Sequence, residues 1–458
     1  MNKNAKLMHL YWRAGFGLSP SEWQQRQNWT TERAVSELFK EARNAKAVTE
    51  PNLRLPNDRN SLSDEEKKKL RRQSNQLLAE INTDWIKRMA QPSESALLER
   101  MSLFWHGHFA CESKGPRVAV RQLNTIRQHA LGNFKDLVLA IARDPAMIRY
   151  LNNQQNRKRS PNENFARELL ELFTVGIGHY SETDIKEAAR AFTGWSSTGQ
   201  GEFVFRSRQH DYGSKSFMGK TGDFDGEGII DIILEQPQTA KFIATKIYRY
   251  FVNEDLDNVR IEQLAQQFYQ SNYDIAALMR SIFSSDWFYD AKHIGAKIKS
   301  PVELTVGIIR SLEAQSLDQK SLINVQRLLG QTLFKPPNVA GWKGGKAWID
   351  NATLMLRLNM VEYFTKGAKV RRGRIRMNDE MMQTSGEGGR MLLNLDSFLA
   401  LQNRSETEIF EQLQAYFLPA YPNLDAKQIL PFVDKSSKEN YIKSLILRLT
   451  SLPEYQMC

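Results

Sequence analysis

The spacing of apolar residues constrains the fold of this chain more than any other feature of its sequence. In the second half these residues step along in helical register, as in Ile261, Leu264 and Phe268, and again in Ile275, Leu278, Met279, Ile282 and Phe283. Such spacing puts each set on one face of a helix. The sequence therefore predicts an all-α fold, built mainly as an array of helices.

Several predicted helices begin with the same local signal. A serine precedes a proline at the first helical position, and a glutamate follows, in Ser19-Pro20-Ser21-Glu22, Ser160-Pro161-Asn162-Glu163 and Ser300-Pro301-Val302-Glu303. The serine oxygen and the glutamate carboxylate accept hydrogen bonds from backbone N–H groups at the start of a helix. Ser63-Asp64-Glu65-Glu66 is a version without proline, and Ser181 is a further predicted cap.

Strand signals are few. The best is Phe203-Val204-Phe205, which follows a turn at Gly199-Gln200-Gly201, and we expect a minor β-hairpin near residues 196–225. Residues 1–365 form the predicted main helical domain and residues 391–458 a helical appendage. Residues 45–63 and the basic, glycine-rich residues 366–390 are predicted linkers, the latter carrying Lys366, Lys369, Arg371, Arg372, Arg374 and Arg376.

Composition narrows the function only slightly. The 458 residues include 63 Lys and Arg against 52 Asp and Glu, a formal charge of +11 that favours anionic partners. The acidic residues are interspersed throughout, so nucleic acid is an unlikely ligand. Two cysteines exclude a disulfide framework, and no membrane span or secretory leader is recognisable in the sequence. We therefore expect a cytoplasmic, soluble protein.

Two of the seven histidines lie together in Phe104-Trp105-His106-Gly107-His108-Phe109. Both imidazoles could bind one divalent metal (zinc, manganese or iron) only if Gly107 ends or distorts the preceding helix. Residues two apart on a regular helix point in different directions. If the helix continues, His108 falls on its apolar face as a hydrogen-bonded core residue.

A second candidate lies on the predicted helix that starts at Asn162. Asn164, Glu168 and Glu171 line up at i, i+4 and i+7, and paired carboxylates on one helix face can hold a hard cation or serve as acid and base. The alternative is a solvated face on which Arg167 pairs with Glu163 or Glu171.

Two loops complete the candidates. His210-Asp211-Tyr212-Gly213-Ser214-Lys215 combines an imidazole, a carboxylate and an amine in a glycine-containing loop, where a ligand or a proton transfer is plausible. The loop at residues 336–345 carries Trp342, whose ring could wall a pocket and stack on a ligand. The alternatives for the first loop are ordinary turn chemistry and a surface ion pair. The alternative for the second is an ordered connection packed on the core.

Taken together, these phrases resemble the bacterial family known as domain of unknown function 1800. The matching phrases keep their order and spacing to about residue 365: Arg13-Ala14-Gly15-Phe16-Gly17, Trp105 to Phe109, Asn162 to Tyr180, Thr193-Gly194-Trp195, His210-Asp211 with Lys215 and Gly219, Phe242-Ile243-Ala244, Tyr250-Phe251-Val252 and residues 330–345. The sequence departs from the pattern at Phe173, where many relatives have histidine, and at Gly107, where asparagine is frequent. Phe173 thus removes one candidate ligand or proton carrier.

The resemblance implies a largely α-helical protein, and a sulfatase-like partner because genes of such a family often lie nearby. It implies no settled activity. We hypothesise an enzyme-like pocket with His106 and His108 as metal ligands, Glu168, Glu171, His210 and Asp211 as catalytic groups, and Asn164, Arg167, Lys215 and Trp342 holding an anionic or polar substrate. The alternative is a noncatalytic helical binding or assembly module.

Overall fold

The computed structural model describes residues 3–43, 46–52, 62–113, 115–315, 318–366 and 394–458. The predicted fold class is confirmed, since helices make up most of these residues and the strands are short. A single cluster of buried apolar side chains runs from Leu7 to Cys458 and joins the helices. Most of the predicted basic linker lies outside the described residues, as does part of residues 45–63.

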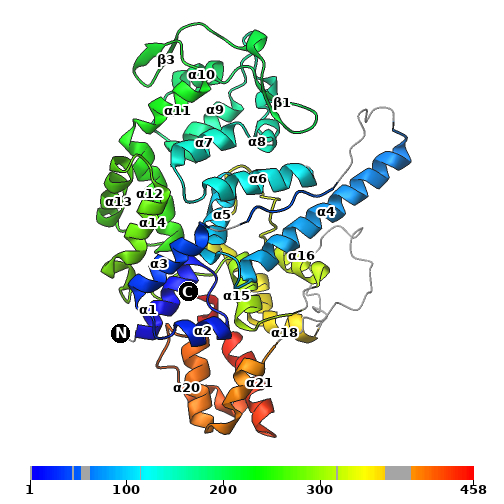
Figure 1. The fold of residues 1–458 in the computed structure, drawn as a ribbon, viewed down its shortest axis with the longest axis vertical. Coiled ribbons are helices and arrows are strands. Elements are labelled where there is room, and N and C mark those ends of the chain that lie inside the picture. The colour runs from blue at the N-terminus through cyan, green and yellow to red at the C-terminus, as the bar shows by residue number, and fades with distance from the viewer. Residues whose placement is uncertain (1–2, 44–45, 53–61, 114, 316–317, 367–393) are drawn as a thin grey trace.

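The first half of the chain contributes these helices: α1 (Lys3–Ala14), α2 (Pro20–Arg26), α3 (Thr31–Ala42), α4 (Asp64–Ala90), α5 (Ala96–His108), α6 (Pro116–His129), α7 (Phe134–Ala142), α8 (Pro145–Tyr150), α9 (Asn164–Glu168) and α10 (Glu182–Ala191). Helix α4 packs on α5, α6, α15 and α16 through its C-terminal part. Its N-terminal half projects from the body beside α6 (Figure 1).

The second half contributes α11 (Gly226–Leu234), α12 (Pro237–Phe251), α13 (Asn258–Gln270), α14 (Ile275–Ser284), α15 (Pro301–Ser311), α16 (Gln319–Leu328), α17 (Asn351–Leu358), α18 (Met360–Lys366), α19 (Asp396–Leu399), α20 (Glu406–Phe417) and α21 (Lys438–Thr450). The apolar spacing of this half is confirmed, because Ile261, Leu264, Phe268, Leu278 and Ile282 are all buried. Helices α20 and α21 lie at the end of the molecule opposite β3 and α10 (Figure 1).

Most of the predicted helix starts are confirmed. Ser19, Ser63 and Ser300 each accept the N–H of a glutamate three residues on, whose carboxylate accepts the serine N–H in return. Ser181 forms the same reciprocal pair with Asp184. The start at Ser160 is wrong, because Ser160 pairs with Arg157 in an isolated bridge and α9 begins only at Asn164.

The β structure is two small hairpins rather than the one expected. Strand β1 (Trp195–Ser197) pairs antiparallel with β2 (Phe203–Phe205), which is the predicted strand, in the register Trp195 to Phe205. Strand β3 (Lys215–Phe217) pairs antiparallel with β4 (Lys220–Gly222). The second hairpin turns at Met218 and Gly219, both with positive φ, which is the conformation that a tight two-residue turn requires.

The helix predicted from Asn162 to Phe173 changes type halfway. After α9 it continues as a π-helix over Leu169–Thr174, and the N–H groups of Val175 and Gly176 both bond to the carbonyl of Leu170. A π-helix turns less per residue than an α-helix, so side chains beyond Leu169 leave the faces that α-helical spacing predicts. Glu171 nevertheless stays close enough to Glu168 to raise the pKa of that carboxyl group.

A dry cluster of ionised side chains ties the ends of the chain to its middle. We call it the Glu303 cluster; its members are Arg13, Arg100, Lys297, Lys299, Glu303 and Arg357, each less than 7% exposed. Glu303 lies 2.5 Å from Arg100 and 3.1 Å from Lys297, and it also accepts the N–H of Ser300. Burial alone would raise the pKa of Glu303, but Arg100 and Lys297 outweigh it and hold the value at about 2.

Each remaining cation of the Glu303 cluster donates to a carbonyl group, although Nε and Nη1 of both Arg13 and Arg357 are buried without a partner in the described structure. Arg13 donates to the carbonyl of His293, and Arg357 to that of Lys299. Lys299 donates to the carbonyl of Tyr455 and sits 3.6 Å from the centre of the Trp12 ring. Burial lowers the pKa of Lys299 to about 7.

Residues 394–458 lie against the N-terminal helices. Tyr416 donates its hydroxyl proton to the carbonyl of Leu18, and Cys458 exchanges backbone hydrogen bonds with Lys297. Whether these residues form a separate unit, as the predicted boundary at 391 requires, stays a prediction. Within the described part of the chain, no helix combines the length and the apolarity needed to cross a bilayer.

Candidate functional site

A cleft of about 1080 Å³ lies beside the projecting helix α4. Its walls come from α4, from residues 112–113 and 115–118 at the start of α6, from the end of α8 and from the β1–β2 loop. These elements lie around the right-hand and upper parts of Figure 1. Sites for single small molecules usually occupy roughly 300–1000 Å³. The cleft is therefore large enough for an oligomeric ligand.

Positive charge dominates the walls of this cleft. Among the described residues that line it, five are cationic and one is acidic: Lys67, Arg71, Arg117, Arg149 and Lys335 against Glu112. Helix α6 also begins at the cleft, and its N-cap Gly115 has no side chain to satisfy the free N–H groups of the first turn. Free N–H groups and the helix dipole add to the attraction for an anion.

Some of these cations already have partners. Arg117 lies 3.8 Å from Glu50 and Lys67 lies 3.7 Å from Asp64. Arg149 donates to the hydroxyl of Ser197 and to the carbonyl of Thr198. Arg71 and Lys335 are exposed and form no ion pair with any described residue. Ion pairs at such distances near solvent are weak, so an anionic ligand can compete with Glu50 and Asp64 for their cations.

Neutral polar side chains fill the space between the cations. Ser74, Asn75, Ser113, Asn152, Gln154 and Gln200 all line the cleft. Ser113 is only 4% exposed, and its hydroxyl donates to the side-chain oxygen of Gln122. The side-chain oxygen of Gln154 is buried and accepts no hydrogen bond within the described structure. Tyr150 is the aromatic residue of the lining.

His106 is buried on α5 and contacts the predicted aromatic loop. Its Nε2 atom accepts the backbone N–H of Phe334 at 3.1 Å, and its ring centre lies 5.6 Å from that of half-buried Trp342. Burial lowers its pKa to about 4, so the imidazole is neutral. The expected meeting of these two segments is therefore seen, but Nε2 is not free to bind a metal.

His108 points to a different side of α5, as residues two apart on a continuous helix must. The helix runs through Gly107 to His108 without distortion. His108 Nε2 lies 3.0 Å from the carbonyl of Phe173, and Nδ1 lies 3.3 Å from the ammonium of Lys246. Lys246 also donates to the carbonyl of Leu172. His108 and Lys246 thus hold the C-terminal end of the π-helix.

Burial sets the charge of this pair. Burial, and then the neighbouring Lys246, lower the pKa of His108, which is therefore neutral and donates from Nε2. Burial lowers the pKa of Lys246 to about 8. With both ring nitrogens engaged by protein groups, His108 has the surroundings of the core residue that the sequence left open as an alternative.

The two predicted carboxylates have different surroundings. Glu171 accepts the hydroxyl of Tyr180 at 3.0 Å. Glu168 is half-buried, and no described residue donates a hydrogen bond to it. Burial, followed by repulsion from Glu171, raises the pKa of Glu168. Burial, followed by the charges of Cys111, Glu112 and Glu168, raises the pKa of Tyr150, a residue that lines the cleft.

The predicted substrate-binding residues of this helix face solvent or pair locally. Arg167 forms a two-pronged pair with Glu182 at 2.9 Å and also reaches Glu163 at 3.1 Å. Asn164 is exposed at the start of α9, and its N–H bonds to the side chain of Asn162. Arg167 does not reach Glu171, so only one of the two pairings left open by the sequence is present.

The loop at residues 210–215 is closed by its own hydrogen bonds. Asp211 receives two hydrogen bonds from Arg190 of α10, and this contact lowers its pKa. His210 Nδ1 lies 2.8 Å from the carbonyl of Thr193. Buried Lys215 donates to the carbonyls of Asp211 and Gly213. Asp211 is thus engaged by α10, Lys215 by the loop itself, and His210 by Thr193 just after α10.

The structure therefore brings the predicted residues together in separate pairs. His106 meets Trp342, His108 meets the π-helix, and Asp211 pairs with Arg190 of α10. In the described residues there is no group of three or more His, Cys, Asp or Glu side chains placed to hold a metal ion. The sequence offered little signal for the cleft, although Gly115-Pro116-Arg117 is a helix start that lacks a capping side chain.

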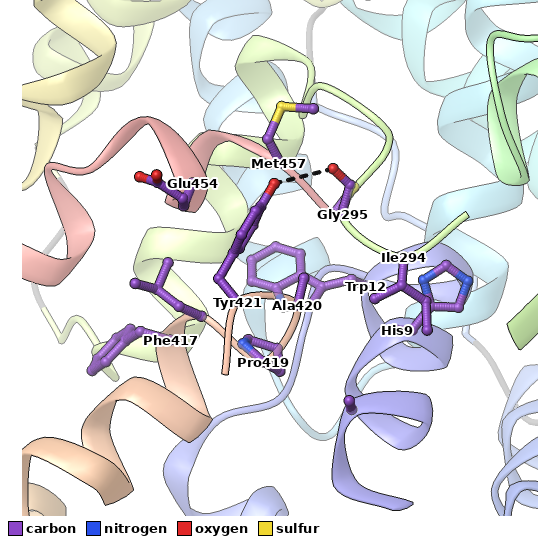
Figure 2. Close-up of a pocket in the computed structure, with 13 residues that line it drawn as sticks. His9, Trp12, Ile294, Gly295, Phe417, Pro419, Ala420, Tyr421, Glu454 and Met457 are labelled. Atoms are coloured by element: carbon purple, nitrogen blue, oxygen red, sulfur yellow. Dashed lines mark hydrogen bonds between the residues drawn. The ribbon is translucent and has the colours of Figure 1, made fainter. Parts of the chain in front are cut away.

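A second, much smaller pocket lies where residues 417–421 and 454–458 meet α1 (Figure 2). Trp12, Ile294 and Tyr421 are among its lining residues, and Tyr421 donates to the carbonyl of Gly295. Its volume is about 20 Å³, which is room for about one water molecule. The pocket is a packing defect at an internal junction, too small for a substrate.

Comparison with known proteins identifies the family. Residues 9–457 match the model of a protein of unknown function, DUF1800. The chain belongs to the DUF1800 family. The match extends well beyond residue 365, where the resemblance noted in the sequence ended, and takes in α19 to α21. No curated protein and no solved structure matches the chain.

Proposed function

We propose that this DUF1800 protein binds an elongated anionic ligand in the cleft beside α4. The observation that carries the proposal is the fivefold excess of cationic over acidic side chains in a cleft of about 1080 Å³. Cations gathered in a concave surface raise the local concentration of anions. The excess lies on four separate elements, so a ligand must be long enough to reach across them.

We also propose a catalytic step on the bound ligand, with Glu168 as its general acid or base. Its pKa is raised, so the carboxyl group keeps its proton closer to neutral pH than an ordinary glutamate does. A carboxyl group tuned in this way is suited to general acid or base work. Glu168 is not among the described residues that line the cleft, but its charge acts on Tyr150, which does line it. In this proposal the role of Glu171 is to repel the charged form of Glu168 and so to keep its pKa raised.

The sulfatase-like partner that the family resemblance implies fits the same proposal. Sulfate esters are anionic groups, so an enzyme that removes or releases them would share ligands with a cationic cleft. The metal-binding role of His106 and His108 gains no such support, since their ring nitrogens are held by Phe334, Phe173 and Lys246.

Binding can be tested by titrating the purified protein with hexagalacturonate and with inorganic polyphosphate of similar charge, using calorimetry at several salt concentrations. The variant Arg71→Gln/Arg149→Gln/Lys335→Gln removes three cations of the cleft. We expect it to bind at least about tenfold more weakly and with less dependence on salt, because exposed charges act through a screened field.

The matched control removes three exposed lysines outside the cleft, Lys40→Gln/Lys435→Gln/Lys438→Gln. This control changes the net charge equally and should bind like the wild type. Binding weakened equally in both variants, or no binding of any anion by the wild type, would refute the cleft as the site.

The catalytic proposal needs a separate readout. Products of hexagalacturonate after long incubation can be followed by mass spectrometry for the wild type, Glu168→Gln and the exposed control Glu202→Gln. Glu168→Gln should lose any turnover while keeping the wild-type affinity. Turnover that survives in Glu168→Gln would show that this carboxyl group is not the acid or base.

A further inference from the structure

The directions of the hydrogen bonds at the wall of the cleft restrict the chemistry of the ligand further than its charge does. Ser113 donates its hydroxyl proton to Gln122 Oε1 at 3.1 Å, and Gln122 Nε2 donates to Asp144 Oδ1 at 3.4 Å. Asp144 Oδ1 in turn accepts the N–H groups of Ala146 and Met147 as the N-cap of α8. Ser113, Gln122 and Asp144 are all at least 95% buried.

The direction of this chain is fixed at its buried end. An oxygen that already accepts two backbone N–H groups needs a donor from Gln122, which is the amide NH₂. The amide oxygen must then face Ser113, and the single hydroxyl proton of Ser113 is used on it. Burial raises the pKa of Asp144 to about 7, but a proton on this carboxyl would sit on the other oxygen, so the chain keeps its direction in both charge states.

Ser113 can therefore only accept a hydrogen bond from anything in the cleft. Gln154 offers a second acceptor, because its side-chain oxygen is buried without a partner in the described structure while the residue lines the same cleft. A buried acceptor left unsatisfied is costly, and a ligand that donates to it recovers that cost. The cationic side chains that line the cleft would repel an ammonium group, so the donor on the ligand must be uncharged.

We infer that the ligand of the cleft is an acidic oligosaccharide, whose hydroxyl groups donate to Ser113 and Gln154 while its acidic groups meet the cationic walls. This inference rests on the proposed anion-binding function and narrows it. A polyphosphate chain carries charge but no donor at neutral pH. A single-stranded nucleic acid would call for several stacking platforms, whereas Tyr150 is the one aromatic side chain among the described lining residues.

The test compares three probes: hexagalacturonate, inorganic polyphosphate of similar charge and a single-stranded RNA hexamer. The wild type should bind hexagalacturonate about tenfold or more tightly than either other probe, since one good hydrogen bond at a buried acceptor corresponds to roughly a factor of ten. Ser113→Ala should lose about tenfold for hexagalacturonate and leave polyphosphate binding unchanged. Ser113→Thr, which keeps the hydroxyl, should restore the preference.

Two controls separate this inference from the cleft itself. Ser74→Ala removes a cleft hydroxyl that no described protein acceptor fixes, and it should leave the preference among probes unchanged. Arg149→Gln should weaken both anions alike. Equal binding of hexagalacturonate and polyphosphate, tighter binding of RNA, or a preference that survives Ser113→Ala would overturn the saccharide inference while leaving the anion cleft in place. Failure of every anion to bind would instead remove the proposed function.

Discussion

The cleft and the Glu303 cluster both gather cations, but they do so in opposite surroundings. The cleft holds five cations and one acidic residue at its walls, next to water. The Glu303 cluster holds five cations around one carboxylate with almost no exposure. In the cluster every cation is held by the carboxylate, a carbonyl group or an aromatic face.

The difference shows that location, more than the number of charges, decides what a cation contributes. In the dry cluster, removing one partner leaves a charge that water cannot reach, and the cost falls on folding. At the cleft, solvent screens each charge, so removal costs folding little and changes mainly the attraction for a ligand. The predictions below test this contrast from its strongest consequence to its weakest.

The largest effect should come from Glu303→Gln. The change leaves Arg100 and Lys297 buried without a carboxylate, and breaking one partner of a buried pair typically costs about 3–5 kcal/mol. We expect the free energy of unfolding, measured with urea, to fall by that amount. The exposed pair of Glu439 with Lys443 offers the control, and Glu439→Gln should change the same quantity by less than about 1 kcal/mol.

Acid titration gives a second measure of Glu303. Its pKa of about 2 in the folded protein lies below the ordinary value of 4.5, so its contribution is complete above pH 4.5 and lost as the pH falls towards 2. Glu303→Gln should lack this loss of stability. A variant whose stability falls with acid as steeply as that of the wild type would show that Glu303 is not the anchor of the cluster.

A smaller effect is expected from Lys299, the cation of the Glu303 cluster that is held by a carbonyl and two aromatic rings. Its folded pKa of about 7 lies below the ordinary 10.5, so the unfolded chain binds more protons between these values. Stability should therefore rise as the pH increases from 7 towards 10. Lys299→Met should flatten that rise in melting curves, and an unchanged slope would contradict the lowered pKa of this buried lysine.

The smallest effect on folding should come from the cleft. Arg71→Gln, Arg149→Gln and Lys335→Gln should each change the free energy of unfolding by no more than about 0.5 kcal/mol, as surface substitutions usually do. The same variants should weaken anion binding, with a larger effect at low salt than at high salt. A large loss of stability in any of them would mean that these side chains hold the fold as the Glu303 cluster does.

The sequence was sufficient to predict the helices and many of their boundaries. Capping pairs such as Ser300 with Glu303, and apolar spacing such as that from Ile275 to Phe283, act over a few residues and are readable without the fold. The family could also be recognised from ordered short phrases, and the match over residues 9–457 confirms it. The same local reasoning was wrong at Ser160, whose strand-like pairing with Arg157 outweighed a capping signal.

Only the tertiary structure decided where the chemistry-bearing side chains lie. The π-helix after Leu169 is supported by His108 and Lys246, which are far away in the sequence, and it turns Glu171 towards Tyr180. The cleft joins α4, α6, α8 and the β1–β2 loop, and Glu303 serves both as a helix cap and as the partner of Arg100. Capping residues and apolar spacing depend only on the nearby backbone, whereas burial and charge pairing depend on contacts between residues that only folding brings together.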